Sequence, residues 1–419
     1  LDSAERHEGM VAAIAFESVV KLVAVFTFVM IMVAYATLLE RWIAAWIQDR
    51  VGPNRAGPKG LFQPLADGLK NILKEEVIPG GASKVFFVIA PAISLMAALM
   101  IPLTIPWAAP IPLEFDVTLP LLGRIVHHGS TAAAVTVLPI GFLYVLAVSS
   151  VGVYGIALGG WASNNKYSLM GGLRATAQMV SYEVAMGLSV IPVLLLVGNV
   201  SFVEIVTAQQ QGPFGWLALP LALSAFIFLV SGFAETNRVP FDMPESESEL
   251  VAGYHTEYSA MKFSAFMIAE FAAMVTIAMM FTTLFLGGWD IPFTHWDEAG
   301  GMAQFLVTAV VFFAKCLFFL FLFMWVRWTL PRFRYDQLMA LGWKVFIPMG
   351  LAYALLVAVA VRVVDGPLGV TSVAARSGLL FLANIPVLAF VFRVLDRGRL
   401  IRGSSIRSPA PAPRRARAA

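Results

Sequence analysis

The sequence predicts an all-α integral membrane protein that crosses the bilayer about nine times. Apolar residues make up 59% of the 419 residues and charged residues only 13%, whereas soluble globular proteins have about 45–50% and about 25%. The mean hydropathy is +0.79, so the chain has too few polar groups to cover a surface in water. Apolar runs of spanning length also recur along most of the chain. These three observations exclude a soluble multidomain protein.

Each predicted span is an apolar run of about 20 residues or more, the length that an α-helix needs to cross the hydrocarbon core. In chain order, the runs lie near residues 11–46, 85–109, 132–159, 178–198, 215–237, 261–287, 303–328, 344–364 and 378–395. The first run is too long for a cleaved signal peptide, and no small-residue cleavage site follows it. We therefore expect one helical membrane domain over residues 1–395 and a basic, disordered tail over residues 396–419.

Lysine and arginine residues favour one side of these spans. The loops after the first, third, fifth and seventh spans carry 14 of them, and the loops after the even-numbered spans carry three. Because positive charge marks the cytoplasmic side of a membrane protein, we expect the N-terminus outside and the C-terminus in the cytoplasm. The chain would then be a multi-pass protein of the cell's inner membrane. Two of its cytoplasmic loops, 47–84 and 238–260, are longer than a mere connection requires.

The sequence provides no site for a redox cofactor. The single cysteine, Cys316, cannot by itself hold an iron–sulfur cluster or a four-cysteine zinc site. The five histidines lack the spacing of metal ligands, and no glycine-rich nucleotide-binding motif occurs. We therefore expect no metal, flavin or nucleotide on this chain and no nucleic-acid partner. Any redox centre must belong to another chain.

Ionisable side chains inside the apolar runs are the most informative residues, because each charge at mid-bilayer costs roughly 2.5–3.5 kcal/mol. They must face protein or water rather than lipid. In the first span, Arg41 is expected to extend toward the interface and Glu17 to neutralise Lys21 one turn away. Three other carboxylates have no basic residue one turn away in their own spans: Glu183, Glu235 and Glu270. These three either hold helices together or form part of a proton relay.

The loop that joins Glu235 to Glu270 is acidic, although its side of the membrane favours basic loops. Its only lysine or arginine is Arg238. Close carboxylates raise one another's pKa, so some of them would hold protons near neutral pH. The loop is either a solvated acidic segment or an extension of the relay. Its acidic residues are Asp242, Glu245, Glu247, Glu249 and Glu257.

The first long loop combines a turn cluster with a short helix. GPNRAGPKG at 52–60 is rich in glycine, proline and basic residues, and LFQPLADGLKNILKE at 61–75 keeps apolar residues at helical spacing. We expect an amphipathic helix that lies in the plane of the membrane interface. A re-entrant packing loop is the alternative.

Four long polar strings lie in or beside the predicted cytoplasmic loops. They are ERWIAAWIQDRVGPNRAGPKGLFQPLADGLK at 40–70, GWASNNKYSLMGGLRATAQMVSYEV at 160–184, FAETNRVPFDMPESESELVAGYHTEYSAMKF at 233–263 and WVRWTLPRFRYDQLMALGWK at 325–344. Together these strings resemble the H-subunit family of bacterial respiratory complex I, whose members are homologues of the first mitochondrially encoded NADH dehydrogenase subunit. The resemblance implies a cofactor-free subunit at the heel of the membrane arm of an NADH:quinone oxidoreductase.

The same resemblance implies two sets of site residues. The first set would line a quinone tunnel built partly from the first span, the first loop and the sixth span. Trp42 departs from the family, which commonly has a basic residue there. The strip with Arg332, Arg334 and Asp336 resembles a loop that packs beside the cavity. The tunnel residues are Glu40, Arg41, Arg50 and Asp67, with Arg55 nearby as a loop organiser. The relay residues are Glu183, Glu235, Asp242, Glu245, Glu247, Glu249, Glu257 and Glu270.

The resemblance also implies partners. Quinone would be the substrate, FMN and iron–sulfur clusters would lie on partner subunits, and the polar loops would dock the quinone-reducing peripheral-arm subunits. The relay would lead to antiporter-like subunits of the membrane arm, and membrane lipid would surround the rest. Two alternatives remain: the homologous subunit of a membrane-bound hydrogenase, and a stand-alone proton or cation transporter. A transporter would favour internal repeats and broken helices, which the sequence does not show.

Overall fold

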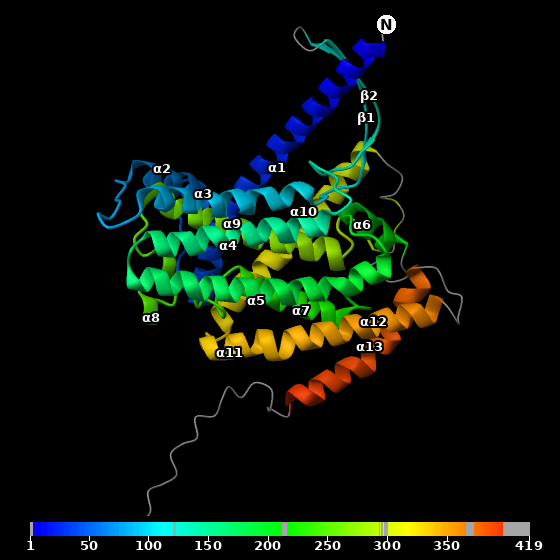
Figure 1. Ribbon diagram of the computed structural model, residues 1–419. Helices are drawn as coiled ribbons and strands as arrows, with labels where there is room; N and C mark the ends of the chain where they lie inside the picture. The colour runs from blue at the N-terminus through cyan, green and yellow to red at the C-terminus, as the bar shows by residue number, and fades with distance from the viewer. Residues whose placement is uncertain are drawn as a thin grey trace, which may run out of the picture.

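The described part of the chain is a bundle of long helices (Figure 1). A computed structural model describes the chain except for residues 1–2, 120–122, 212–215, 293, 295, 297–300, 366–372 and 397–419. Side chains are likewise described except for those residues and for 3–17, 112–119, 123–131, 247–248, 365, 373–375, 390, 392 and 394–396. The predicted tail and the side chain of Glu17 therefore lie outside the described part.

A helix occupies the position of every predicted span. The long helices are α1 (Ser3–Ile47), α3 (Lys84–Met100), α4 (Gly141–Ala162), α5 (Lys166–Val197), α7 (Ala222–Glu235), α9 (Ala260–Phe285), α10 (Met302–Thr329), α12 (Ile347–Asp365) and α13 (Val373–Asp396). Within the described residues, seven apolar helical segments are long enough to cross a membrane, and the stretches Ala222–Glu235 and Arg376–Ala389 are shorter. The helical membrane fold is therefore confirmed, while the number of crossings and their orientation stay predictions.

The short elements gather at the ends of the bundle. They are η1 (Pro58–Gly60), α2 (Gln63–Leu73), η2 (Ile101–Thr104), α6 (Phe202–Gln210), α8 (Glu247–Leu250), η3 (Gly253–His255), α11 (Tyr335–Ala340) and the π-helix η5 (Leu341–Phe346). Figure 1 shows α2, α8 and α11 at one end and α6 at the other. The loops predicted to be cytoplasmic therefore share one end of the molecule.

One element was not predicted: an antiparallel hairpin of β1 (Ile111–Leu119) and β2 (Gly123–Thr131), in which Val117 pairs with Ile125. It lies beside the N-terminal half of α1 (Figure 1). Just after β2, the carbonyl of Ala132 accepts a hydrogen bond of 2.9 Å from Lys21 Nζ. A search for apolar runs of spanning length could not detect two strands of nine residues each.

Helix α5 begins at Lys166, well before the predicted start near residue 178, so much of the expected loop 160–176 is helical. The side chain of Asn165 accepts a hydrogen bond of 2.9 Å from the backbone of Tyr167 and so caps the helix start. At the other end, Gly198 adopts φ of 78° and its N–H donates to Leu194, as glycine does at helix ends. The polar string at 160–184 therefore extends α5 beyond its apolar part.

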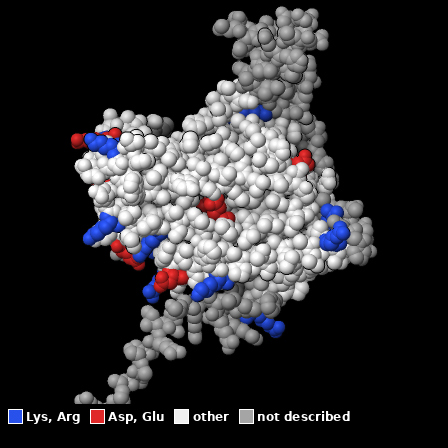
Figure 2. Space-filling model, in the orientation of Figure 1, with Lys and Arg blue, Asp and Glu red and all other residues white. Residues whose placement is uncertain are grey.

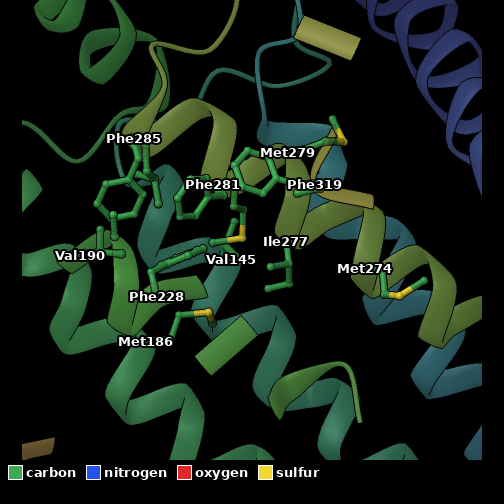
Figure 3. Close-up of a cluster of buried hydrophobic side chains, with 14 of the residues drawn as sticks. Val145, Met186, Val190, Phe228, Met274, Ile277, Met279, Phe281, Phe285 and Phe319 are labelled. Atoms are coloured by element: carbon green, nitrogen blue, oxygen red, sulfur yellow. The ribbon is translucent and has the colours of Figure 1, made fainter. Parts of the chain in front are cut away.

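Helix α9 is the centre of the bundle. Within its most apolar window 72% of the residues are buried, against 28% for α1 and α10. Phe281 and Phe285 of α9 pack against Phe228 of α7 and Phe319 of α10, with ring centroids 4.5–6.0 Å apart (Figure 3). Since lipid is as apolar as these side chains, close packing rather than escape from water stabilises the contacts. Glu270, in the predicted cytoplasmic half of α9, is thereby placed inside the bundle.

Glycines bring α3, α4 and α5 close together. A Cβ atom added to Gly155 of α4 would lie 2.8 Å from the carbonyl oxygen of Ala90 in α3. One added to Gly160 would lie 2.7 Å from the carbonyl oxygen of Ser168 and 3.1 Å from Cα of Gly172, both in α5. Small residues at such positions are typical of helix contacts in membranes.

The face of the molecule shown in Figure 2 is nearly free of charge over the helices, and most charged residues lie toward the end that carries α2, α8 and α11. One small acidic patch interrupts this face over α4 and α5. Glu183 is the single acidic residue of these two helices. A mostly uncharged belt with charge at its ends is the surface that a bilayer or neighbouring membrane helices would cover.

Candidate functional site

A large cavity opens at the end of the bundle that carries the predicted cytoplasmic loops, and we call it the main cavity. Its volume is about 640 Å³, and α1, α2, α9, α10 and the segment after α7 form its walls. Apolar side chains of α1 and α9, including Met30, Val33 and Ile268, cover one part. The charged lining residues are Glu40, Arg41, Arg50, Asp67, Arg238, Asp242, Glu245, Glu270 and Arg327. Four of the five predicted tunnel residues are therefore brought together.

The outer wall of this cavity joins α1 to α2. Arg41 lies in the last turns of α1, and its Nη1 is 2.7 Å from Oδ2 of Asp67 on α2. The other oxygen of Asp67 accepts a hydrogen bond of 3.0 Å from Gln63. Arg41 thus pairs with a carboxylate near the end of α1, and its extension toward the interface stays a prediction. The predicted amphipathic helix is confirmed as α2, whose leucines at 65, 69 and 73 are exposed.

The remaining tunnel residues are less constrained. Arg50 lines the cavity and donates through Nε to Oε1 of Gln48 over 2.7 Å. Arg55 is exposed and does not line the cavity. The structure therefore gives Arg55 a place on the loop surface rather than in the wall.

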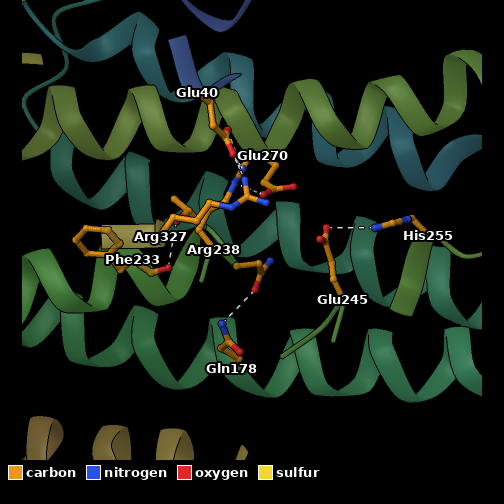
Figure 4. A network of polar contacts seen from close by, with 10 residues as sticks. Glu40, Gln178, Phe233, Arg238, Glu245, His255, Glu270 and Arg327 are labelled. Atoms are coloured by element: carbon orange, nitrogen blue, oxygen red, sulfur yellow. Dashed lines mark hydrogen bonds and ion pairs between the residues drawn. The ribbon is translucent and has the colours of Figure 1, made fainter. Parts of the chain in front are cut away.

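A buried ion-pair cluster forms the inner wall (Figure 4). Nη1 of Arg238 lies 3.2 and 3.1 Å from the two oxygens of Glu40, and Nε of Arg238 pairs with Glu270. Arg327 of α10 pairs with Glu40 as a second cation. Burial alone would lower the pKa of Arg238, but Glu270 and Glu40 outweigh it and raise that pKa. The guanidinium therefore stays charged between two carboxylates.

Two acids of the loop after α7 also reach this cavity. Asp242 Oδ2 lies 2.7 Å from Nη2 of Arg332, while its buried Oδ1 has no hydrogen-bond partner. Burial and the charge of Glu245 raise the pKa of Asp242 to about 6, against the opposing effect of nearby arginines. Glu245 lies 3.2 Å from Nε2 of His255. Burial raises the pKa of Glu245, but His255 and the arginines prevail and lower it.

The other loop acids lie apart from both cavities. Glu249 pairs with Arg174 over 2.6 Å and is largely exposed, and Glu257 accepts a hydrogen bond of 2.6 Å from Asn165. The side chain of Glu247 lies outside the described residues. The predicted row of loop carboxylates is therefore divided, with Asp242 and Glu245 inside and Glu249 and Glu257 at the surface.

A second, smaller cavity of about 80 Å³ lies deeper among the helices. Glu235 and Ser149 line it, and Glu235 Oε2 is buried without a hydrogen-bond partner. Glu270 and Asn237 line both cavities. This volume is large enough to hold water beside the polar groups that line it. The two cavities thus share a wall that carries a carboxylate.

Glu183 is linked to the second cavity through serine. Its Oε1 accepts hydrogen bonds of 2.8 Å from Ser149 and 2.7 Å from Ser150 on α4. Ser149 also lines the cavity that holds Glu235 and Glu270. The three intramembrane carboxylates singled out from the sequence therefore lie around one connected polar region, although they come from three different helices.

Several residues of this site could not be identified from the sequence. Arg327 and His255 were not singled out, and Arg238 was noted only as the lone basic residue of its loop. The serines at 149 and 150 resemble ordinary polar residues of a membrane helix. Only their tertiary partners distinguish them. Among the described residues, no three histidine, cysteine or acidic side chains are placed to hold a metal ion.

Comparison with known proteins extends these observations. The family described as NADH dehydrogenase matches residues 20–358. The chain is 48% identical to an H subunit of NADH-quinone oxidoreductase from Cytophaga hutchinsonii over 338 residues, which cover 80% of this chain and 94% of that protein. It is also 48% identical to the H subunit of NADH-quinone oxidoreductase from Flavobacterium johnsoniae over 344 residues, 82% of this chain and 94% of that protein. Both cavities lie within the matched range, and α13 lies beyond it.

Proposed function

Because this chain belongs to the NADH dehydrogenase family and is a multi-pass membrane subunit of an NADH-quinone oxidoreductase, we propose that its main cavity binds quinone and that its buried carboxylates couple quinone reduction to proton translocation. The observation that carries the proposal is the shared wall. Glu270 faces both the main cavity and the smaller one that holds Glu235. A chemical event in the first cavity can therefore change the charge seen in the second.

The main cavity has the chemistry that a quinone needs. An isoprenoid tail requires an apolar path, which Met30, Val33, Met267 and Ile268 supply. A reduced headgroup requires charged groups that manage its protons, and such groups line the same space. We propose that Glu40, Arg41, Arg50 and Asp67 contribute to this binding site. Arg55 would act only by organising its loop.

The chain would manage protons and leave electron transfer to other subunits. Electrons would come from the FMN and iron–sulfur centres of partner subunits. Asp242 and Glu245 would respond to charge in the main cavity, and Glu270 would transmit the change to Glu235 across the shared wall. Ser149 would connect this region to Glu183. Glu247, Glu249 and Glu257 would extend the acidic path toward the surface of the assembly.

The same proposal assigns partners to the surfaces. The end with α2, α8 and α11 would dock the quinone-reducing peripheral arm at the cytoplasmic side of the inner membrane. The nearly uncharged face that carries Glu183 would meet other membrane-arm subunits, including antiporter-like ones, and lipid would cover the rest. The names of the two relatives favour this assembly over a hydrogenase or a lone transporter.

Glu235→Gln tests the proposal. Glutamine keeps the size of the side chain but cannot release a proton, so the assembled variant should lose most of its quinone-dependent turnover and proton pumping together. Both are measured in proteoliposomes, with NADH:ferricyanide activity as the check on the peripheral arm. Glu204→Gln is the matched control, because Glu204 is an exposed carboxylate on α6. Normal pumping and turnover in Glu235→Gln would show that this carboxylate contributes only to packing.

A further inference from the structure

Arg238 lines the main cavity beside the two residues, Asn237 and Glu270, that line both cavities. It follows α7 by three residues, and its side chain is 8% exposed. Its guanidinium contacts Glu40 through Nη1 and Glu270 through Nε. Cζ of Arg238 also lies 4.3 Å from the ring centroid of Phe271, the residue next to Glu270. One buried cation therefore serves two carboxylates, of which Glu40 lines the main cavity alone and Glu270 lines both cavities.

The two carboxylates do not depend equally on Arg238. Glu40 has a second cation, Arg327, whereas Arg238 is the cation that pairs with Glu270 among the described residues. If the guanidinium turned fully toward Glu270, Glu40 would keep a partner. If it turned fully toward Glu40, Glu270 would be left as an uncompensated buried charge.

A buried carboxylate without a cation binds a proton rather than remain charged, because an isolated buried charge is very unfavourable. The position of one side chain thus decides the charge of another. The ring of Phe271 lies 4.3 Å from Cζ of Arg238, a cation–π contact that favours a charged side chain at this point. Because Glu40 and Glu270 both contact the same guanidinium, a rotation of this side chain is enough to change how its charge is divided.

We propose that Arg238 is a movable positioning residue, which divides its charge between Glu40 and Glu270 and thereby sets whether Glu270 holds a proton. The proposal rests on the function proposed above and deepens it. A negative charge that forms in the main cavity near Glu40 draws Arg238 away from Glu270. Glu270 then takes one proton from Glu235, which lines the same second cavity. When Arg238 returns, Glu270 gives that proton back, so protons and charges balance.

Infrared spectroscopy of the assembled complex tests whether Arg238 sets the protonation of Glu270, because a protonated carboxyl group and a carboxylate absorb at different frequencies. In Arg238→Gln, Glu270 loses its cation, so the resting complex should gain one carboxylic acid at neutral pH. The gain should vanish in Arg238→Gln/Glu270→Gln. Assembly of the double variant where the single variant fails to assemble would support the same coupling, since breaking a buried pair typically costs about 3–5 kcal/mol.

Arg327→Gln is the matched control. It removes the other arginine from Glu40 but leaves Glu270 paired, so it should add no carboxylic acid at Glu270. An equal gain in Arg327→Gln and Arg238→Gln would overturn the proposal. An Arg238→Gln complex that assembles without gaining a carboxylic acid would also overturn the proposal. The same holds if both the single and the double variant fail to assemble, because Arg238 would then have only a structural role.

A redox difference spectrum tests the movement. Reduction of quinone in the unaltered complex should replace the carboxylic-acid band of Glu235 with that of Glu270, and this Glu270 band should be absent in Glu270→Gln. Persistence of the band in Glu270→Gln would overturn the assignment. These readouts do not depend on turnover or pumping, so a failure here is distinguishable from a failure of the proposed function in Glu235→Gln.

Discussion

Removing the Asp67 carboxylate separates two roles that this residue could have in the main cavity. Asp67 pairs with Arg41 over 2.7 Å and holds α2 against α1. Helix α2 buries none of its residues, so this pair is a notable part of its attachment. Asp67→Ala would remove the tether and, if Asp67 also serves quinone, a charge from the binding site.

The size of the effect distinguishes the roles. The side chains of Arg41 and Asp67 are 47% and 32% exposed, and ion pairs that are exposed contribute about 0.2–1 kcal/mol. Loss of the tether alone should therefore lower kcat/KM for quinone by about fivefold at most. Loss of a charge that also interacts with the headgroup should cost about 1.5–3 kcal/mol, or roughly 10- to 150-fold. We expect the larger loss.

The assay is quinone reductase activity of the assembled complex over a range of quinone concentrations, with NADH:ferricyanide activity expected to persist. Glu76→Ala is the matched control, because Glu76 pairs with Lys262 over 2.9 Å and ties the same loop to α9 without lining the cavity. Equal losses in the two variants would show that both carboxylates merely hold the loop. Unaltered quinone kinetics in Asp67→Ala would remove it from the site.

Three further predictions concern the arginine of the cavity wall, the loops and the acid beside Arg332. Arg50→Ala should lower quinone reductase activity while NADH:ferricyanide activity persists, since Arg50 lines the cavity. Unchanged quinone kinetics in this variant would exclude Arg50 from the quinone site. Loops 47–84, 160–176, 238–260 and 329–343 should exchange amide hydrogen slowly in the intact complex, and fast exchange in all four would contradict their burial by partners. Asp242 should titrate near pH 6 in infrared spectra, and Asp242→Asn should remove that titration. Because folding raises this pKa from 3.8, its stabilising effect is complete below pH 3.8 and is lost as the pH rises through about 6.

The sequence predicted the fold better than it predicted the pairing of charges. Apolar length depends on the chain alone, so every predicted span coincides with a helix. Partners such as Arg238 and Glu40 are 198 residues apart, and spacing along the chain carries no information about such contacts. The family resemblance singled out Glu40 and Glu270 as residues but could not supply the arginine between them. The carboxylates of the acidic loop looked equivalent in sequence, and only folding separated Asp242 and Glu245 from Glu249 and Glu257.

The close approach at Gly155, Gly160 and Gly172 limits how this molecule can deform. At these positions backbone lies against backbone, so a sliding of α4 along α3 or α5 would place larger side chains where there is no room for a Cβ atom. These contacts therefore oppose sliding of the three helices past one another. A change of charge at the loop end is accommodated more easily by rotation of side chains than by displacement of these helices.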